Sequence, residues 1–172
     1  MKAIFLDRDD TIIVNKDYLN TPDGIEFLPN AIAGLQAFRD LGYQLIVLTN
    51  QSGIARGYFS PQTLQAIHER LRVLLAHHGL QLAGIYVCPH APTDDCDCRK
   101  PRTGLLQQAL RDFDIDLTRT AMLGDGKGDI GLANAAHLPA IHITNGKTAP
   151  LPNADFVCRD LLEAAHLPIF NP

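Results

Sequence analysis

Two pairs of carboxylates stand at spacings that could hold a metal ion. Asp7 and Asp9 follow a short apolar run at the start of the chain, and Asp125 and Asp129 lie in the glycine-rich segment 124–129. Carboxylates gathered in a partly buried site require a counter-ion, and Mg²⁺ with its oxygen ligands is the usual one beside phosphate. Each pair alone is also typical of a solvated acidic turn, but together they predict a hard divalent cation.

Donors and cations that suit a phosphate group lie elsewhere in the chain. The segment 49–53 (TNQSG) offers hydroxyl, amide and backbone N–H donors for phosphate oxygens. Arg99 and Lys100 add two positive charges that would neutralise a transferred phosphoryl group. Each segment alone could be an ordinary polar loop. Beside the carboxylates, they indicate chemistry on a small phosphorylated substrate.

A second kind of metal site is indicated by three thiols and one imidazole in a short stretch. The four side chains are Cys88, His90, Cys96 and Cys98. Four soft ligands that leave no coordination position open are typical of structural Zn²⁺. The segment 91–95 has no periodic apolar pattern, so zinc would order it and thereby fix Lys100, two residues beyond the last ligand. Cys158 is distant and is expected to be a small core residue.

The elements that must position these groups alternate along the chain. Strands are expected at 2–6, 44–48, 84–87, 120–123, 140–143 and 156–157, and helices at 30–41, 61–78, 103–113, 129–136 and 161–166. This alternation predicts a Rossmann-like three-layer α/β/α sandwich around a parallel sheet. The polar groups follow the first four strands, where ligands of such sheets bind.

Composition narrows the classes of function. A chain of 172 residues with 46% hydrophobic residues suits a single domain spanning 1–172. A net charge of −4 disfavours nucleic acid and anionic membranes as partners. The sequence shows neither a membrane-spanning apolar run nor a signal-peptide pattern, so a cytoplasmic location is expected. The histidines outside the cysteine cluster are expected to lie on the surface or to be satisfied in the core.

The polar motifs, taken in order, resemble phosphatases of the haloacid dehalogenase superfamily. They are DxDxT at 7–11, a threonine at 49, a lysine at 100 and GDxxxD at 124–129. The closer likeness is to a subgroup carrying DRD, TNQSGIARG, CPH, CxCRKP and GD in that order, and it covers nearly the whole chain. That subgroup contains D-glycero-D-manno-heptose 1,7-bisphosphate 7-phosphatases and histidinol-phosphate phosphatases.

The resemblance implies a role for each motif residue. Asp7 would attack phosphorus and carry the covalent phosphate, and Asp9 would act as general acid and then as general base. Mg²⁺ would be held by Asp7, the backbone carbonyl of Asp9, and Asp125. Thr49 and Lys100 would stabilise the phosphoryl oxygens.

The remaining roles concern the surroundings of this centre. Asp129 would orient Lys100 or a water on the metal. The residues expected to touch the rest of the substrate are Asn15, Tyr18, Asn50, Gln51, Ser52 and Arg99. Asp10 stands where the subgroup usually has glycine. The short interval 12–27 predicts a minimal cap over the site, and the likeness implies a monomer.

Four functions remain open at this point. The first is a heptose 1,7-bisphosphate 7-phosphatase, and the second is a histidinol-phosphate phosphatase, which the short interval 91–95 would also suit. A polynucleotide 3′-phosphatase shares several motifs, but the negative charge and the lack of a basic stripe count against it. A zinc-binding module without catalysis would require the polar groups at four strand ends to be coincidental.

Overall fold

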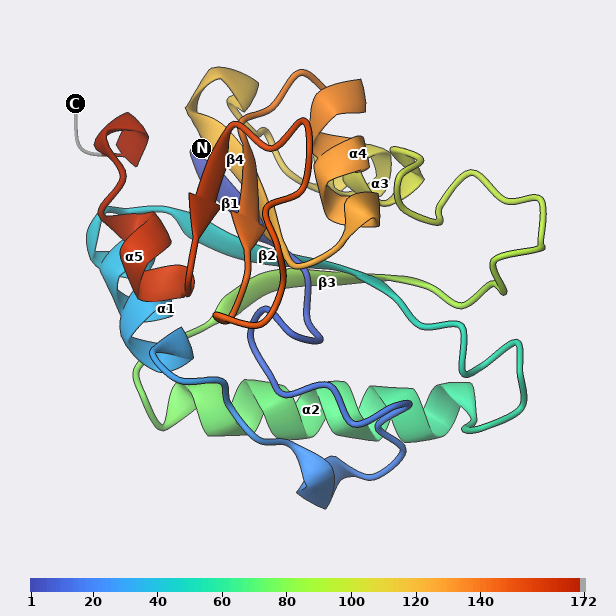
Figure 1. Cartoon of the computed structure of the whole chain (residues 1–172). Helices are drawn as coiled ribbons and strands as arrows, with labels where there is room; N and C mark the ends of the chain where they lie inside the picture. Colours follow the sequence, from blue (N-terminus) through green and yellow to red (C-terminus); the bar gives the residue numbers. More distant parts are fainter. Residues whose placement is uncertain (171–172) are drawn as a thin grey trace.

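A six-stranded parallel sheet forms the centre of the computed structural model, which describes residues 1–170 (Figure 1). The strands are β1 (Ala3–Leu6), β2 (Gln44–Asn50), β3 (Leu82–Cys88), β4 (Thr120–Gly124), β5 (Ala140–Ile143) and β6 (Phe156–Cys158), in the spatial order β3-β2-β1-β4-β5-β6. The helices are α1 (Ala31–Asp40), α2 (Pro61–Ala76), α3 (Gly104–Asp112), α4 (Lys127–Ala135) and α5 (Leu161–Ala165). The predicted Rossmann-like three-layer α/β/α fold is confirmed.

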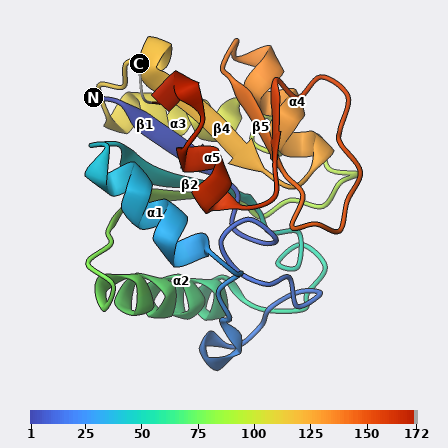
Figure 2. The same ribbon diagram turned by 60° about the vertical axis from the view of Figure 1, so that its left-hand side comes forward.

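The helices cover both faces of the sheet. Ile4 and Leu6 of β1 join a core with α1, α2 and α5, whereas Ala3 and Phe5 join a second core with α3 and α4. Figure 2 shows α1, α2 and α5 on one side of the strands and α3 and α4 on the other. Because successive side chains of a strand point to opposite faces, a strand buried on both faces must be apolar throughout, as β1 is.

Local signals explain where the helices begin and end. The Ser60 hydroxyl accepts from the backbone N–H of Thr63 at 3.0 Å, and Pro61 opens α2, as its sequence predicts. Gly42 and Gly79 follow the ends of α1 and α2 with φ of +81° and +70°, a conformation that glycine adopts without a steric cost. Cys158 is buried in β6, which confirms its expected place in the core.

The differences from the predicted elements are small. β3 begins at Leu82 rather than at residue 84, and α2 ends at Ala76 rather than near residue 78. Three short 3₁₀ helices were not predicted: Pro22–Gly24, Leu117–Arg119 and Pro168–Phe170. Within residues 1–170, the interval between β1 and α1 contains one such turn, so the cap is minimal, as expected. None of the helices in this range is long and apolar enough to span a membrane.

Candidate active site and zinc centre

A cavity of about 300 Å³ opens beyond the carboxyl ends of β1, β2 and β4. Its lining residues come from three loops and are Asp7, Arg8, Asp9, Asn15, Asp17, Tyr18, Leu19, Asn50, Gln51, Ser52 and Asp125. The parallel register explains this convergence, because Leu6 pairs with both Val47 and Leu123. The backbone N–H of Asp7 donates to Leu123 O at 2.9 Å, which fixes the first carboxylate at the sheet edge.

Lys100 is the buried cation at the base of the carboxylate cluster. Its Nζ donates to Asp7 Oδ1 at 2.8 Å, to Asp129 Oδ1 at 2.6 Å and to the carbonyl of Leu48 at 2.6 Å. Burial alone would lower the pKa of Lys100, but the charges of Asp129 and Asp7 outweigh it and the net shift is upward. The lysine therefore stays protonated and has all three of its N–H donors engaged.

The backbone around Lys100 is held from two sides. Asn50 accepts from the Lys100 N–H at 3.0 Å and donates to the Lys100 carbonyl at 3.2 Å. On the opposite side α4 approaches closely, because a Cβ on Gly131 would lie 2.6 Å from Pro101 Cβ and one on Gly128 would lie 3.3 Å from Lys100 O. The side-chain amide of Asn50 and the close approach of α4 at two glycines thus fix the backbone of Lys100. Its position therefore does not depend on the cysteine loop alone.

Three carboxylates meet beside this lysine. One oxygen each of Asp7, Asp125 and Asp129 lies within 4.8 Å of the others. Burial raises the pKa of Asp7 most, Lys100 lowers it, and the charges of Asp129 and Asp9 raise it further, so the net result is a pKa of about 7. Burial and the charges of Asp7, Asp129 and Asp10 raise the pKa of Asp125 to about 8. The single positive charge of Lys100 therefore does not balance the negative charges of these three carboxylates.

An Mg²⁺ ion fits this donor set because the available ligands are hard oxygens. Asp129 has both oxygens engaged, Oδ1 with Lys100 and Oδ2 with the backbone N–H of Gly126 at 3.0 Å. Asp7 has Oδ1 engaged with Lys100, so Asp7 and Asp125 have the less occupied carboxylate oxygens for a metal. The contact of Asp129 with Lys100 is compatible with the prediction that Asp129 orients Lys100 or a water on the metal, and that role stays a prediction.

The loop after β4, which carries Asp125, is held in place by His142. This residue of β5 is fully buried, and its Nδ1 accepts from the backbone N–H of Leu151 at 3.2 Å. The proton of the neutral ring must then lie on Nε2, which donates to the carbonyl of Asp125 at 3.1 Å. The N–H of Leu151 thus sets the tautomer of His142, and the Nε2–H of that tautomer holds the carbonyl of Asp125.

Known proteins resemble this chain over most of its length. The HAD-hydrolase-like family model matches residues 97–164. The D-glycero-beta-D-manno-heptose-1,7-bisphosphate 7-phosphatase of Pseudomonas aeruginosa is 38% identical over 168 residues, covering 94% of each chain. The Haemophilus influenzae protein of that name is 42% identical over 135 residues, which cover 75% of this chain and 73% of that one. The chain belongs to the HAD-like hydrolase family.

A solved HAD-like structure agrees with this assignment. The D,D-heptose 1,7-bisphosphate phosphatase from B. bronchiseptica, complexed with magnesium and phosphate, superposes with a TM-score of 0.85 at 32% identity. The superposition covers 96% of both chains. The sequence resemblance to the haloacid dehalogenase superfamily is therefore confirmed.

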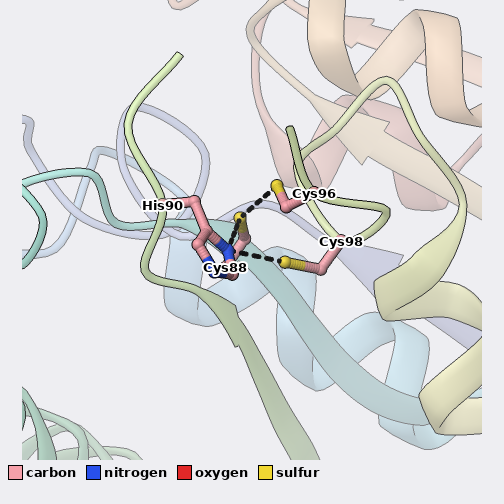
Figure 3. A group of neighbouring side chains, drawn as sticks. All are labelled: Cys88, His90, Cys96 and Cys98. Atoms are coloured by element: carbon pink, nitrogen blue, oxygen red, sulfur yellow. Dashed lines mark hydrogen bonds between the residues drawn. The ribbon is translucent and has the colours of Figure 1, made fainter. Parts of the chain in front are cut away.

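This HAD-like chain carries its soft ligands beside β3 (Figure 3). One ligand atom each from Cys88, His90, Cys96 and Cys98 lies within 4.8 Å of the others. Tetrahedral zinc with Zn–S bonds of about 2.3 Å separates two sulfurs by about 3.8 Å, and sulfur from nitrogen by about 3.6 Å. The structure has 3.8 Å between Cys88 and Cys96 sulfurs, and 3.6 Å and 3.2 Å from His90 Nδ1 to the sulfurs of Cys88 and Cys98. These side chains therefore fit one zinc ion.

The cysteine loop is also tied to its surroundings. Arg102 donates to the carbonyl of Cys96 and pairs with Asp95 at 3.0 Å. A Cβ on Gly104 would lie 2.4 Å from the carbonyl oxygen of Asp97, so glycine at the start of α3 lets the loop pack closely. Cys88 ends β3 and is fully buried, which anchors one side of the cluster to the sheet.

The residues expected to touch substrate fall into two groups. Asn15, Tyr18 and Ser52 line the cavity, and the Tyr18 ring packs against Tyr58 with centroids 4.6 Å apart. Asn50 and Gln51 also line it, but their amides hold other site residues. Arg99 is absent from the lining residues described and donates to the carbonyl of His90 at 3.3 Å. Substrate contact stays a prediction for all six.

Gln51 connects two of the predicted catalytic residues. Its Nε2 donates to Asp9 Oδ2 at 2.9 Å and to Thr49 Oγ1 at 2.7 Å. A hydroxyl that accepts in this way still has its own proton to donate, so Thr49 keeps the donor that a phosphoryl oxygen would need. Thr49 and Gln51 are both buried, which favours a fixed geometry.

Sequence reasoning missed three side chains around the site. Arg8 stands between two aspartates and was given no role of its own, yet it is buried. His68 and His142 were expected to be surface or satisfied core residues, and their contacts with Arg8 and with the loop of Asp125 were not predicted. The available signal was position, since a histidine within an apolar helix face or strand must find polar partners.

Proposed function

We propose that this chain is a Mg²⁺-dependent phosphatase that removes the C7 phosphate of D-glycero-D-manno-heptose 1,7-bisphosphate. The observation that carries the proposal is the contact of Lys100 with Asp7 and Asp129 beside Asp125, at the carboxyl edge of the sheet. This is the arrangement that the DxDxT, Lys and GDxxxD motifs require. The names of the relatives supply the substrate.

The proposed first step transfers the phosphoryl group to the protein. A carboxylate oxygen of Asp7 forms a bond to phosphorus while the bond from phosphorus to the sugar oxygen breaks. Asp9 gives its proton to that oxygen, so the sugar leaves as a neutral alcohol. Thr49 would donate to a phosphoryl oxygen, and the positive charge of Lys100, whose Nζ donates to Asp7, would stabilise the negative charge that gathers on the phosphoryl group.

The second step frees the enzyme. A water molecule attacks phosphorus, Asp9 takes the proton of that water, and the bond between phosphorus and Asp7 breaks to release inorganic phosphate. Mg²⁺, held by Asp7, Asp125 and the carbonyl of Asp9, would offset the repulsion between the substrate and the carboxylates. Zn²⁺ at the cysteine cluster would order the neighbouring loop and take no part in bond making.

The substrate is tested by comparing kcat/KM of the purified protein for both anomers of heptose 1,7-bisphosphate and for histidinol phosphate. We expect a heptose bisphosphate to be preferred. A higher kcat/KM for histidinol phosphate would replace the proposed substrate with the alternative while leaving the chemistry in place. Turnover of neither class would overturn the proposal.

The nucleophile is tested by Asp7→Asn, which keeps the size of the side chain and removes its charge. We expect kcat to fall by at least about 10⁴-fold, as for loss of a covalent nucleophile. Zinc content should stay near one ion per chain, because Asp7 lies outside the cysteine cluster. Activity within tenfold of the parent would refute the covalent role of Asp7.

A further inference from the structure

The side chain of Arg8 is buried between the general acid and a helix. It is 1% exposed, although it lies in the loop between Asp7 and Asp9. Its Nη2 donates to both oxygens of Asp9, at 3.1 Å and 2.9 Å. Its Nη1 lies 3.1 Å from Nε2 of His68, a residue of α2. A connection thus runs from the helix through the guanidinium to the carboxylate.

The direction of the hydrogen bonds in this connection is fixed by chemistry. A guanidinium has donors and no acceptor, so His68 Nε2 must accept and its proton must lie on Nδ1. Burial lowers the pKa of His68 to about 3, and the charges of Arg8 and Arg72 add to this effect. His68 is therefore a neutral, fixed acceptor for Arg8.

Burying the charged side chain of Arg8 costs free energy, which indicates that Arg8 has a role other than stabilising the fold. Its Nε is buried and has no hydrogen-bond partner among residues 1–170. Burying a cation carries a desolvation cost and an unpaired N–H adds to it, so an apolar side chain of similar size would fill the space at lower cost. In return, Arg8 contacts both oxygens of Asp9, whose side chain is 23% exposed and is therefore not fixed by burial alone.

The geometry points to Arg8 and His68 as positioning residues for proton transfer by Asp9. His68 holds the guanidinium at Nη1, and Nη2 of the same guanidinium holds the carboxylate by donating to both of its oxygens. Gln51 adds a third donor to the same carboxylate. The inference rests on the proposed function, because it requires Asp9 to give its proton to the leaving alcohol.

The test uses two substrates that differ in their need for that proton. The alcohol of heptose 1,7-bisphosphate is a poor leaving group, whereas p-nitrophenolate leaves without protonation. For both, kcat/KM reports the steps up to departure of the leaving group. A change that misplaces Asp9 should lower kcat/KM for the sugar phosphate and spare p-nitrophenyl phosphate, whereas a merely structural defect should lower both alike.

The variants are His68→Leu, His68→Gln and Arg8→Lys. His68→Leu removes the acceptor and should lower kcat/KM about tenfold for the sugar phosphate and less than about twofold for the aryl phosphate. His68→Gln supplies an amide oxygen in place of Nε2 and should restore most of the loss. Arg8→Lys keeps the charge but replaces the two nitrogens that contact His68 and Asp9 with one, so it should reproduce the selective loss even if His68→Leu fails to fold.

Two reference variants calibrate the result. Asp9→Asn should show the same selectivity for the poor leaving group, with a larger loss of about 10²-fold or more. His142→Leu is the matched buried histidine, and because it acts through the loop of Asp125 it should lower kcat/KM for both substrates by the same factor. Zinc content and the midpoint of thermal unfolding are measured for each variant.

The possible outcomes distinguish failure of the positioning role of Arg8 and His68 from failure of the proposed phosphatase mechanism. Equal losses for the two substrates in His68→Leu and Arg8→Lys, with selectivity retained in Asp9→Asn, would overturn the positioning role alone. A raised KM at unchanged kcat in Arg8→Lys would also overturn it, since it would make Arg8 a substrate contact. An Asp9→Asn variant without selectivity would instead refute the role of Asp9 in the proposed function.

Discussion

The two candidate metal sites of this chain are held together in opposite ways. At the cysteine cluster the ligand atoms of Cys88, His90 and Cys98 contact one another, and their common partner is the ion they would share. At the carboxylate site the protein supplies the partners, because Lys100 contacts Asp7 and Asp129 while Arg8 contacts Asp9. The metal would order the first site, whereas the fold orders the second.

This difference matches what each site has to do. A structural ion needs a closed shell, and four soft ligands provide it. A catalytic ion must leave positions open for substrate, so the two carboxylates available to it cannot hold the loops in place by coordination. The buried lysine, the amide of Asn50 and the ring of His142 hold those loops instead. Removing either ion should therefore affect the two sites very differently.

The largest effect should come from breaking the cysteine cluster. Cys98→Ser should abolish stoichiometric zinc binding and lower the midpoint of thermal unfolding by about 10 °C, since a structural zinc ligand is lost. Activity should fall about tenfold and remain measurable, because Asn50 and the carbonyl of Leu48 still hold Lys100. Zinc content, unfolding temperature and kcat/KM are the measurements.

The matched control for this change is Cys158→Ser, which alters a buried cysteine of β6 far from the cluster. It should lower stability while leaving zinc content at one ion per chain. Full zinc content and parental stability in Cys98→Ser would contradict the structural role of the ion. Loss of all activity would instead show that the zinc loop, and not Asn50, fixes Lys100.

A smaller effect should appear at the carboxylate site when Mg²⁺ is omitted. The folded-state pKa of Asp7 is raised to about 7 from its ordinary 3.8, so the folded protein binds this proton more tightly than the unfolded chain. Stability from this group is present at low pH and is lost as the pH rises through about 7. Asp7→Asn removes the titrating group, so its unfolding temperature relative to the parent should rise between about pH 4 and pH 7 and level off above that.

The comparison with the parent at each pH is essential to this measurement. The folded-state pKa of His68 is about 3, below its ordinary 6.5. Between these two pH values His68 makes the stability rise with pH, which is the opposite of the effect of Asp7. Because both proteins contain His68 and the zinc cluster, those contributions cancel, and the difference reports Asp7 together with Asp125, whose raised pKa depends partly on the charge of Asp7. Millimolar Mg²⁺ should reduce the difference by stabilising the parent. A difference that shrinks with rising pH in the absence of Mg²⁺ would show that Lys100 already compensates Asp7.

The sequence predicted what depends on local pattern. The apolar runs at 2–6 and 120–123 specified buried strands, and the polar residues after them specified the edge at which the site forms. It did not predict the partners of individual side chains, because these come from segments far apart in the chain. Asn50 looked like a phosphate donor, but its amide meets the backbone of Lys100, 50 residues away.

Charge patterns were misleading for a related reason. Arg8 lies between two aspartates, a setting typical of a solvated loop, and its burial follows from the packing of α2. Histidines carry little local signal, since His68 and His142 are fixed by contacts with Arg8 and Asp125, 60 and 17 residues distant. The short 3₁₀ turn at Pro22–Gly24 was missed because three residues cannot show a helical period.

The smallest expected effect concerns Asp10, where the related pattern usually has glycine. Asp10 has a φ of +54°, in the left-handed region that glycine enters freely and aspartate tolerates better than most residues. The ordered loop is also held by Asn145, which donates to the Asp10 carbonyl at 2.6 Å. Asp10→Gly should therefore change the free energy of unfolding by less than about 1 kcal/mol, because relief of strain offsets the greater freedom of the unfolded chain.

The charge of Asp10 should matter more than its backbone. It contributes to the raised pKa of Asp125, and so it adds negative potential where the cation would bind. Asp10→Asn keeps the tolerance for positive φ and removes the charge, so Asn and Gly should weaken Mg²⁺ binding equally, by about two- to threefold. Calorimetric titration of Mg²⁺ into both variants measures this. Weaker binding in Asp10→Gly alone would mean that the strained backbone, and not the carboxylate, shapes the metal site.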